Sequence, residues 1–564
     1  MSQHVFEWLA DSFVNEGVEA CFALLGDANM NWATALAGRG VRMIHVRHEH
    51  CAVAAATAYA RKSGKPGIAT VTCGPGLTQV LTALPAAVRA RIPLVVFAGE
   101  APLSASWYNQ QLDQAPFIAA TGASYHALHH VPRMADGIRD AFVEAKEERR
   151  PVVLGVPFDL QTQKINNGGK LPLRSDAVMA KLSPVPPNPA DLSQAADVIG
   201  RARRIVIMGG MGAAASGARE ACTRLAEKVG GLLATTLPAR GLFHGNPFSL
   251  GIAGGFSSTL TRACLAEADL VLAVGCQLTQ HNLDKGKLFP KADILHVDIQ
   301  PRTLIQGMTP ARYWLRGDAR LSVEALLEMV GTQPGWRSDR LAEAIAEAPS
   351  DMAEFPAEPG LLDPRDVVAS LDAALPEDWQ MVNSSGHCSF YFAHMNRPFD
   401  KFLTIREFGA IGNGISYAMG VAVARAGDTV VMFDGDGSLL MHVQELETIR
   451  RNGLNIIICV MNDGAYGSEI HKLRDEGLSD AGAVFGRVDL GAVARGFGLG
   501  GVRVEKLSDL PKLVEEFSKT GGAAVWDFPV SDRVASPVIR RAHPEGHACI
   551  ERQPDDLGSL FGPD

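Results

Sequence analysis

The sequence lacks the features that mark secreted, membrane-spanning and nucleic-acid-binding proteins. Its nine cysteines are scattered, odd in number and without a CxxC pair, so neither a disulfide framework nor a zinc site is expected. No apolar run has the length needed to span a bilayer. The formal net charge of -9 gives no electrostatic reason to expect nucleic acid or an anionic membrane as a partner. Small metabolites are therefore the expected ligands.

The first residues are not expected to form a signal peptide. They read MSQHVFEWLADSFVNEGV, which has the periodicity of an amphipathic helix but neither the basic start nor the apolar core of a secretory signal. Together with the unpaired cysteines, this favours a reducing cytoplasm as the location.

The chain is too long, at 564 residues, for one hydrophobic core. Short apolar runs alternate with helical segments in successive stretches, which is typical of doubly wound α/β domains with mainly parallel sheets. We predict three domains at residues 1–165, 188–332 and 361–540, separated by polar segments that contain proline and glycine. The tail, residues 541–564, has little periodicity and is expected to be a flexible flap.

An acidic turn closes the apolar run TVVMFD; it consists of Gly435, Asp436, Gly437 and Ser438. Residues 429–434 are expected to form a buried strand, LLMHVQELETIRR the next helix and LNIIICVMN the next strand, after which comes Asp463. Both strands of such a unit end at one edge of the sheet, so the two aspartates are expected to face one crevice. Carboxylates suit Mg²⁺ bound to phosphate, and glycines let the backbone approach a ligand closely. The pattern predicts a magnesium-diphosphate site.

These motifs resemble the signature of the thiamine-diphosphate enzymes of the acetolactate synthase and pyruvate decarboxylase type, and the resemblance covers nearly the whole chain. It implies that the first domain binds the aminopyrimidine and the third the diphosphate. The middle domain of that family is structural or holds FAD or ADP. The residues give FAD or ADP no support here, because GGMGAAASG has imperfect dinucleotide spacing and no acidic residue is evident at the end of the next strand.

The resemblance also assigns residues of the first domain. In VRMIHVRHEH, Glu49 takes the place of the glutamate that bonds the pyrimidine ring nitrogen and promotes removal of the thiazolium C2 proton. Without the other motifs, the alternative explanation would be that Glu49 simply caps or solvates a helix N-terminus. The segment SASWYNQQLDQAPF lacks the His-His pair of the decarboxylases and keeps Gln110 as the family's glutamine. Asp27 in LLGDANMNW resembles a decarboxylase acid or base, and Glu469 falls where those enzymes have a catalytic glutamate.

Further cofactor contacts are implied in the third domain. The segment REFGAIGNG resembles the one that holds the cofactor bent, with the Gly409 carbonyl facing the 4'-amino group and Ile411 as the wedge. The same segment would also suit a glycine-rich helix start packed against the sheet. NSSGHCSF resembles the diphosphate-side loop, which implies that Gly386 and His387 approach phosphate oxygens; a lone histidine there would more often be structural. Tyr466 and Gly467 are further implied cofactor contacts, and the implied metal ligands are Asp436, Asp463 and the carbonyl of Ala465.

The resemblance implies thiamine-diphosphate- and magnesium-dependent decarboxylation of a 2-oxo acid, with carboligation to a second carbonyl compound. The missing His-His pair favours ligation, whereas Asp27 and Glu469 favour aldehyde release. The alternatives are a 2-hydroxyacyl-CoA or oxalyl-CoA lyase, whose tail would cover CoA, and a noncatalytic cofactor-binding homologue. A homodimer or homotetramer is expected, because in the family the first domain faces the third domain of another subunit.

Overall fold

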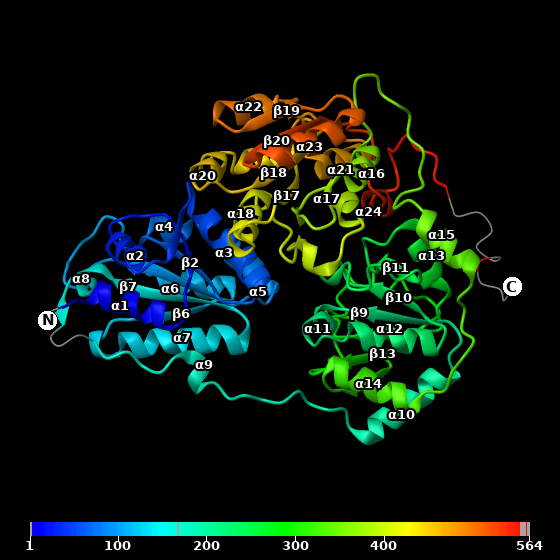
Figure 1. Ribbon diagram of the computed structural model, residues 1–564, viewed down its shortest axis with the longest axis horizontal. Helices are drawn as coiled ribbons and strands as arrows, with labels where there is room; N and C mark the ends of the chain where they lie inside the picture. The colour runs from blue at the N-terminus through cyan, green and yellow to red at the C-terminus, as the bar shows by residue number, and fades with distance from the viewer. Residues whose placement is uncertain (1–2, 166–168, 553–559, 561–564) are drawn as a thin grey trace.

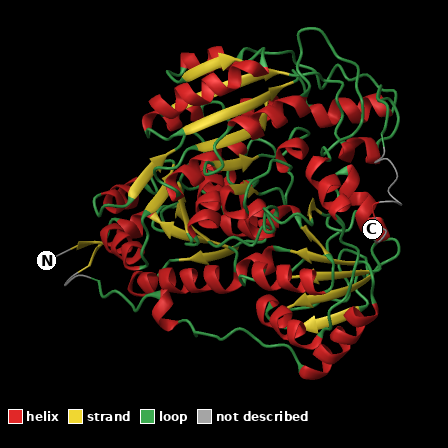
Figure 2. Cartoon of the chain, turned by 45° about the vertical axis from the view of Figure 1, so that its right-hand side comes forward, coloured by secondary structure: helices red, strands yellow, loops and turns green. Residues whose placement is uncertain are grey.

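The computed structural model describes residues 3–165, 169–552 and 560. Three six-stranded sheets follow one another along the chain, and every strand pairing within them is parallel (Figures 1 and 2). Helices cover both faces of each sheet, and the predicted α/β class with three doubly wound domains is confirmed. Within the described residues, no helix combines the length and apolar character required to cross a membrane.

The first sheet has the strand order β3-β2-β4-β5-β7-β6. Its strands are β2 (Ala20–Ala23), β3 (Arg42–His45), β4 (Gly67–Val71), β5 (Leu94–Glu100), β6 (Ser124–Ala127) and β7 (Pro151–Pro157). Its helices are α1 (Val5–Asn15), α2 (Met30–Ala37), α3 (Glu49–Ser63), α4 (Pro75–Thr78), α5 (Ala83–Arg89), α6 (Gln114–Thr121), η1 (Val131–Arg133), α7 (Met134–Glu148) and α8 (Phe158–Gln161). A short antiparallel pair joins β1 (Gln3–His4) to β8 (Lys164–Ile165).

The central sheet has the order β11-β10-β9-β12-β13-β14. Its strands are β9 (Ile205–Gly209), β10 (Leu232–Thr235), β11 (Ser249–Ile252), β12 (Leu270–Val274), β13 (Asp293–Asp298) and β14 (Tyr313–Arg316). The helices from the linker onward are α9 (Ser175–Val178), α10 (Pro189–Arg201), α11 (Met211–Ala215), α12 (Arg219–Lys228), η2 (Leu237–Ala239), α13 (Thr259–Glu267), α14 (Ala319–Met329) and α15 (Asp339–Glu347).

The third sheet, β16-β15-β17-β18-β20-β19, repeats the strand order of the first. Its strands are β15 (Gln380–Asn383), β16 (Phe402–Thr404), β17 (Val430–Gly435), β18 (Ile456–Asn462), β19 (Gly500–Arg503) and β20 (Ala523–Pro529). Its helices are α16 (Pro364–Ala374), α17 (Ser389–Ala393), η3 (Phe399–Lys401), α18 (Gly414–Ala424), α19 (Asp436–Met441), α20 (Glu445–Arg451), α21 (Gly467–Asp475), α22 (Leu490–Gly496), η4 (Leu507–Asp509), α23 (Leu510–Thr520) and α24 (Pro537–Ala542).

The prediction of a single helix after the acidic turn is wrong, because the segment forms two short helices, α19 and α20. His442 lies between them and leaves the helical conformation with φ -134°. Its Nδ1 donates to the carbonyl of Gly412 at 2.9 Å, and its ring stacks on that of His50 at 4.9 Å. Side-chain contacts therefore interrupt a segment whose sequence favours continuous helix.

Helices α3 and α18 join the first domain to the third (Figure 1). Gly420 permits their close approach, because a Cβ there would lie 2.1 Å from the carbonyl oxygen of Ala55. The residues around Glu49 also meet the third domain of the same chain. The Arg47 amide donates to Glu445 at 2.8 Å, and the His50 ring donates to the side-chain oxygen of Asn413.

Two further sequence features have a structural role. The glycines of the GGMG segment pack against the end of β12, where a Cβ at Gly210 would lie 2.2 Å from the Gly275 oxygen.

The tail is bound to the rest of the protein up to residue 552. Ile550 and Glu354 exchange two backbone hydrogen bonds at 2.9 Å, and Arg540, just before the tail, pairs with buried Asp351 at 2.7 Å. The rest of the predicted flap, apart from residue 560, lies outside the described residues.

Candidate active site

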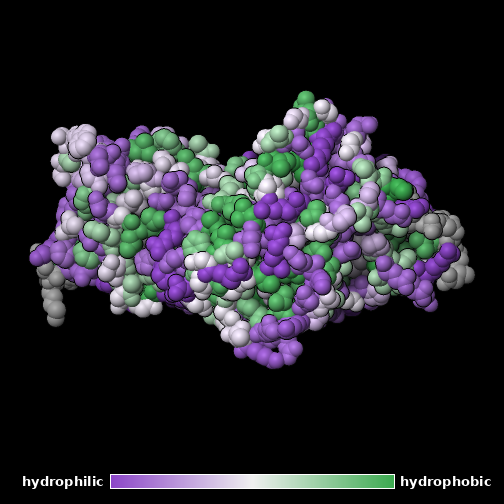
Figure 3. Space-filling model, turned by 90° about the horizontal axis from the view of Figure 1, so that it is seen from above, coloured by the Kyte–Doolittle hydropathy of each residue, from purple (hydrophilic) through white to green (hydrophobic). Residues whose placement is uncertain are grey.

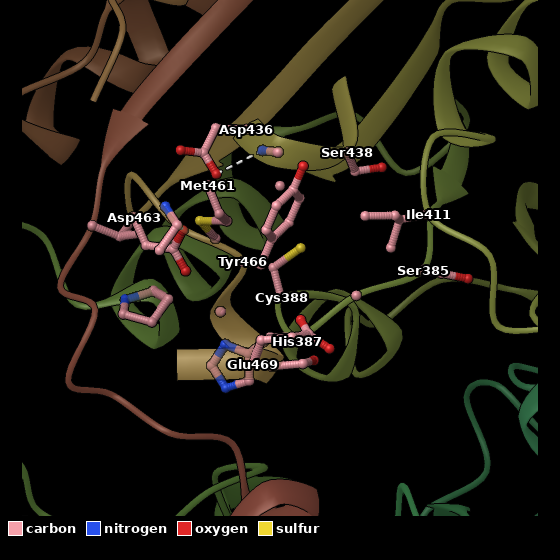
Figure 4. Close-up of a pocket in the computed structure, with 18 of the residues that line it drawn as sticks. Ser385, His387, Cys388, Ile411, Asp436, Ser438, Met461, Asp463, Tyr466 and Glu469 are labelled. Carbon is pink, nitrogen blue, oxygen red and sulfur yellow. Dashed lines mark hydrogen bonds between the residues drawn. The ribbon is translucent and has the colours of Figure 1, made fainter. Parts of the chain in front are cut away.

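A cavity of about 480 Å³ opens at the carboxyl edge of the third sheet (Figure 4). The structure brings together in its wall all the residues that the sequence assigned to the third domain: Gly386, His387, Gly409, Ile411, Gly435, Asp436, Gly437, Ser438, Asp463, Ala465, Tyr466, Gly467 and Glu469. Every described residue that lines it comes from position 364 onward.

Two aspartates lie side by side in this cavity because their strands are neighbours. β17 pairs in parallel with β18, with Gly435 opposite Met461, so Asp436 and Asp463 follow at the same edge. Asp436 is 2% exposed and accepts the amide N–H groups of Gly437 and Gly464, each at 2.8 Å. Asp463 accepts the Ala465 amide at 3.1 Å. Figure 4 shows both carboxyl groups at the end of the cavity opposite Ile411.

Neither carboxylate forms an ion pair with any described cation. Burial raises the pKa of Asp436, and burial together with repulsion by Asp436 raises that of Asp463. A divalent cation would relieve this excess of negative charge. Because no group of three or more His, Cys, Asp or Glu side chains suited to a metal occurs in the described ranges, the remaining ligands would be backbone and ligand oxygens. Such a donor set suits Mg²⁺.

Glycine and serine shape the wall around these carboxylates. A Cβ at Gly467 would lie 2.6 Å from Asp463 Oδ2, and one at Gly437 would lie 2.8 Å from the Tyr466 ring. The hydroxyl of Ser438 accepts the Gly412 amide at 2.8 Å, so it ties the acidic turn to the segment that carries Ile411. The tight wall leaves backbone groups as the nearest contacts for an anion.

His387 is fixed as a neutral hydrogen-bond donor. Its Nε2 accepts the Ser536 amide at 2.8 Å, which places its proton on Nδ1. Burial, with nearby His547 and Arg540, lowers the pKa of His387 to about 4. Nδ1 is directed toward the Gly467 loop, since a Cβ at Gly467 would lie 3.3 Å from it.

Glu469 and Tyr466 lie at the exposed mouth of the cavity. Glu469 accepts from Lys472 at 3.3 Å, one turn further along α21. The Tyr466 ring is 40% exposed and contacts Phe485 edge-on, with ring centres 5.3 Å apart. Both side chains are therefore accessible to a molecule that enters.

The first-domain residues form a separate group at the carboxyl edge of their own sheet and do not line this cavity. Glu49 Oε1 lies 3.6 Å from the position of a Cβ on Gly76, and burial raises the pKa of Glu49. Gln110 accepts a weak hydrogen bond from the Cys73 thiol at 3.5 Å. Asp27 accepts the Tyr108 hydroxyl at 3.3 Å.

Sequence reasoning missed several polar residues of the cavity wall, among them Arg406 and Tyr391. Arg406 belongs to the same REFGAIG segment as Gly409, where a cation among glycine and apolar residues was an available signal. Tyr391 lies on α17, and nothing in its sequence context distinguishes it from a core aromatic residue.

Comparison with known proteins finds relatives for all three parts of the chain. Three family models match: "Thiamine pyrophosphate enzyme, N-terminal TPP binding domain" at residues 3–117, the central domain of the same enzymes at 192–326, and their C-terminal TPP binding domain at 384–528. The protein is 29% identical over 548 residues to acetolactate synthase 2, chloroplastic, of Zea mays, which covers 93% of this chain and 84% of that protein. It is 29% identical over 547 residues to the probable acetolactate synthase 2, chloroplastic, of Oryza sativa subsp. japonica, with coverages of 91% and 81%. The chain therefore belongs to the thiamine pyrophosphate enzyme family.

Proposed function

We propose that this protein is a thiamine-diphosphate- and magnesium-dependent enzyme that decarboxylates a 2-oxo acid and joins the product to a second carbonyl compound. The proposal rests on two carboxylates, Asp436 and Asp463, that have no described cation as a partner and lie in a glycine-walled cavity of a thiamine pyrophosphate enzyme. The names of the relatives, all acetolactate synthases, favour ligation over simple aldehyde release.

Each residue of the cavity has a distinct task in this proposal. Asp436, Asp463 and the Ala465 carbonyl hold Mg²⁺, and His387 donates its Nδ1 proton to a diphosphate oxygen. Ile411, which lines the cavity, would contact the cofactor. Bound thiamine diphosphate supplies the nucleophilic carbon and the electron sink.

Glu49 controls the proton on the pyrimidine ring. The raised pKa of Glu49 would favour a proton shared between its carboxyl group and the ring nitrogen. A fully ionised glutamate would share that proton less well. Gln110 and Asp27, on the same sheet edge, are placed to contact substrate.

A second copy of the chain would bring these residues to the cavity. Apolar side chains are exposed at both sheet edges: Trp107 at 75% and Leu25 at 42% near Asp27, and Tyr466 at 40% and Phe485 at 42% at the cavity mouth. Seen from above, hydrophobic areas also reach the surface across the middle of the molecule (Figure 3). Burial of such areas favours association, so we propose a homodimer or a tetramer built from dimers.

Coassembly of two inactive variants tests this arrangement. If Glu49 of one subunit completes the cavity of the other, mixing Glu49→Gln with Asp436→Ala subunits gives one site with both defects and one intact site. Partial activity should return. Complete failure after verified subunit exchange would show that each site is built within one chain, as the contacts of Arg47 and His50 with their own third domain would permit.

Product analysis tests the reaction. With pyruvate, Mg²⁺ and thiamine diphosphate, chiral gas chromatography should show more 2-hydroxy ketone than acetaldehyde, with a further increase when an aldehyde is added. Acetaldehyde as the only product would favour a decarboxylase. Cleavage of a 2-hydroxyacyl-CoA without turnover of any 2-oxo acid would instead favour the acyl-CoA lyase.

A further inference from the structure

Arg406 presents a positive charge to the same cavity while its own contacts are neutral. Its guanidinium donates through Nη1 to the hydroxyl of Ser389, which itself donates to the Gly386 carbonyl. Its Cζ lies 4.5 Å from the ring centre of Phe256, a residue of the central domain. Two domains therefore hold this side chain in one place on the cavity wall.

Within the part of the chain that the structure describes, no carboxylate forms an ion pair with this guanidinium, and Glu407 acts on it only through its charge. Among the described residues, Arg406 takes part in no ion pair, and the carboxylate of Glu407 accepts the Arg406 backbone N–H rather than its side chain. Glu469, at the mouth, pairs with Lys472. Burial lowers the pKa of Arg406 to about 10, so the group remains charged at neutral pH. Arg406 is partly buried, and a partly buried cation without a paired anion is costly, so a bound anion would offset that cost.

A second donor in the same wall also lacks an acceptor. Tyr391 is 1% exposed, and its hydroxyl has no hydrogen-bond partner among the described residues. It lines the cavity, with its ring centre 6.2 Å from that of His387. Buried hydroxyl groups in proteins are nearly always hydrogen-bonded, and an oxygen of a ligand in the cavity would satisfy this one. The charged side chains that act on Tyr391 are Asp351, Arg540, Arg365 and Asp363.

We propose that Arg406, assisted by Tyr391, forms an anion subsite that binds an oxygen anion of the molecule in the cavity. The planar guanidinium can engage two oxygens of one phosphate or carboxylate group. The thiol of Cys388 lies between Arg406 and the acidic turn, 3.7 Å from the position of a Cβ on Gly435. The anion is the diphosphate of the cofactor or the carboxylate of the 2-oxo acid, and this identification rests on the proposed function.

Calorimetric titration of the full-length, cofactor-free protein with inorganic pyrophosphate and Mg²⁺ tests the diphosphate as the source. The variants are Arg406→Met, which removes the charge, and Arg406→Gln, which keeps an amide donor for the Ser389 hydroxyl and disturbs the wall less. Arg312→Met is the matched control, because Arg312 also lies near an aromatic ring, 5.6 Å from that of Tyr313, but on an exposed surface outside the cavity. A charged hydrogen-bond pair is worth a factor of about 10–100 in affinity.

The half-saturating concentration of pyruvate, measured with saturating cofactor, tests the carboxylate as the source. If the subsite binds the diphosphate, pyrophosphate binding falls at least about tenfold in both Arg406 variants and not in Arg312→Met. If it binds the substrate, pyrophosphate binding is unchanged and the pyruvate requirement rises by that factor. Tyr391→Phe should move the same quantity in the same direction by a smaller factor.

The proposal is overturned if both quantities match wild type in a folded Arg406 variant. Failure of the proposed reaction has a different signature. A wild-type protein that turns over no 2-oxo acid but binds pyrophosphate through Arg406 would refute the reaction and leave the subsite standing. If wild type turns over 2-oxo acids normally while neither pyrophosphate binding nor the pyruvate requirement changes in the Arg406 variants, the subsite alone is refuted.

Discussion

Asp463→Asn is expected to stabilise the cofactor-free protein while weakening its binding of magnesium and diphosphate. Asp463 has no cationic partner among the described residues, and burial with repulsion by Asp436 raises its pKa. The asparagine keeps an oxygen to accept the Ala465 amide, which bonds Asp463 at 3.1 Å, and its amide nitrogen can donate to Asp436. It also keeps an oxygen for the metal, so cofactor binding should weaken without being abolished.

The stability gain depends on pH in a direction that the raised pKa determines. The carboxyl of an unfolded aspartate has a pKa of about 4, so between that value and the higher folded pKa the folded chain binds more protons than the unfolded chain. Wild-type stability therefore falls as pH rises through this window. Asparagine does not titrate, so its advantage is absent near pH 4 and complete above the folded pKa.

The expected gain is a few degrees in melting temperature. A buried donor or acceptor left without a partner costs about 1–3 kcal/mol, and a charged group costs more, so about 2 kcal/mol is a conservative figure for Asp463, which keeps the Ala465 amide. For a domain of about 150–250 residues, roughly 2 kcal/mol shifts the melting temperature by about 4–8 °C.

Scanning calorimetry of the cofactor-free protein at about pH 4.5 and about pH 8 measures the effect. Asp378→Asn, at an exposed aspartate of the same domain, is the matched control and should change little. The reasoning is refuted if Asp463→Asn melts like wild type at both pH values, or gains equally at both.

Three further changes test the chemistry, the domain contact and a buried charge. Glu49→Gln should leave cofactor binding intact but strongly slow deuterium exchange at C2 of the bound cofactor, followed by NMR, because the amide cannot share a proton with the ring; a wild-type rate would show that another group activates the cofactor. In urea unfolding, Gly420→Ala should destabilise the protein by about 1–3 kcal/mol, because its Cβ would lie 2.1 Å from the Ala55 oxygen. The control Gly200→Ala, at a helix position with open space around it, should stabilise the protein by about 0.5–1 kcal/mol. Effects of the same sign would contradict this packing. Burial lowers the pKa of Lys62 to about 7. Between about pH 7 and pH 10 the unfolded chain therefore binds one more proton than the folded chain, so wild-type stability rises with pH in this window. Lys62→Met should flatten that rise, and an unchanged slope would count against a buried, neutral lysine.

The sequence predicted most of the elements that build the candidate site. The buried strands around the acidic turn and Asp463 are long, continuous apolar runs, and their common edge follows from parallel pairing. The edge strands β6, β11 and β14 have only four residues each and mixed burial, so no apolar run marks them in the sequence. Helix α20 was merged with α19 because the contacts that turn His442 out of the helix come from residues distant in the sequence: the His50 ring of the first domain and the Gly412 carbonyl of a neighbouring loop.

The spatial relation between the two groups of site residues could not be predicted from sequence. Glu49 and Asp436 belong to domains more than 380 positions apart, and no local pattern determines how their sheet edges meet. Arg406 was overlooked for a related reason. Its lack of an anionic partner is a property of the folded wall, to which Phe256 contributes from the central domain.

The most direct test of the account is calorimetric titration of thiamine diphosphate into wild type and Asp436→Ala, with and without Mg²⁺. Asp436 is buried, accepts two backbone amides and faces Asp463 without any described cation between them. The account predicts magnesium-dependent binding to wild type and no detectable binding to the variant. Equal affinity in Asp436→Ala, or wild-type binding that is indifferent to Mg²⁺, would contradict it.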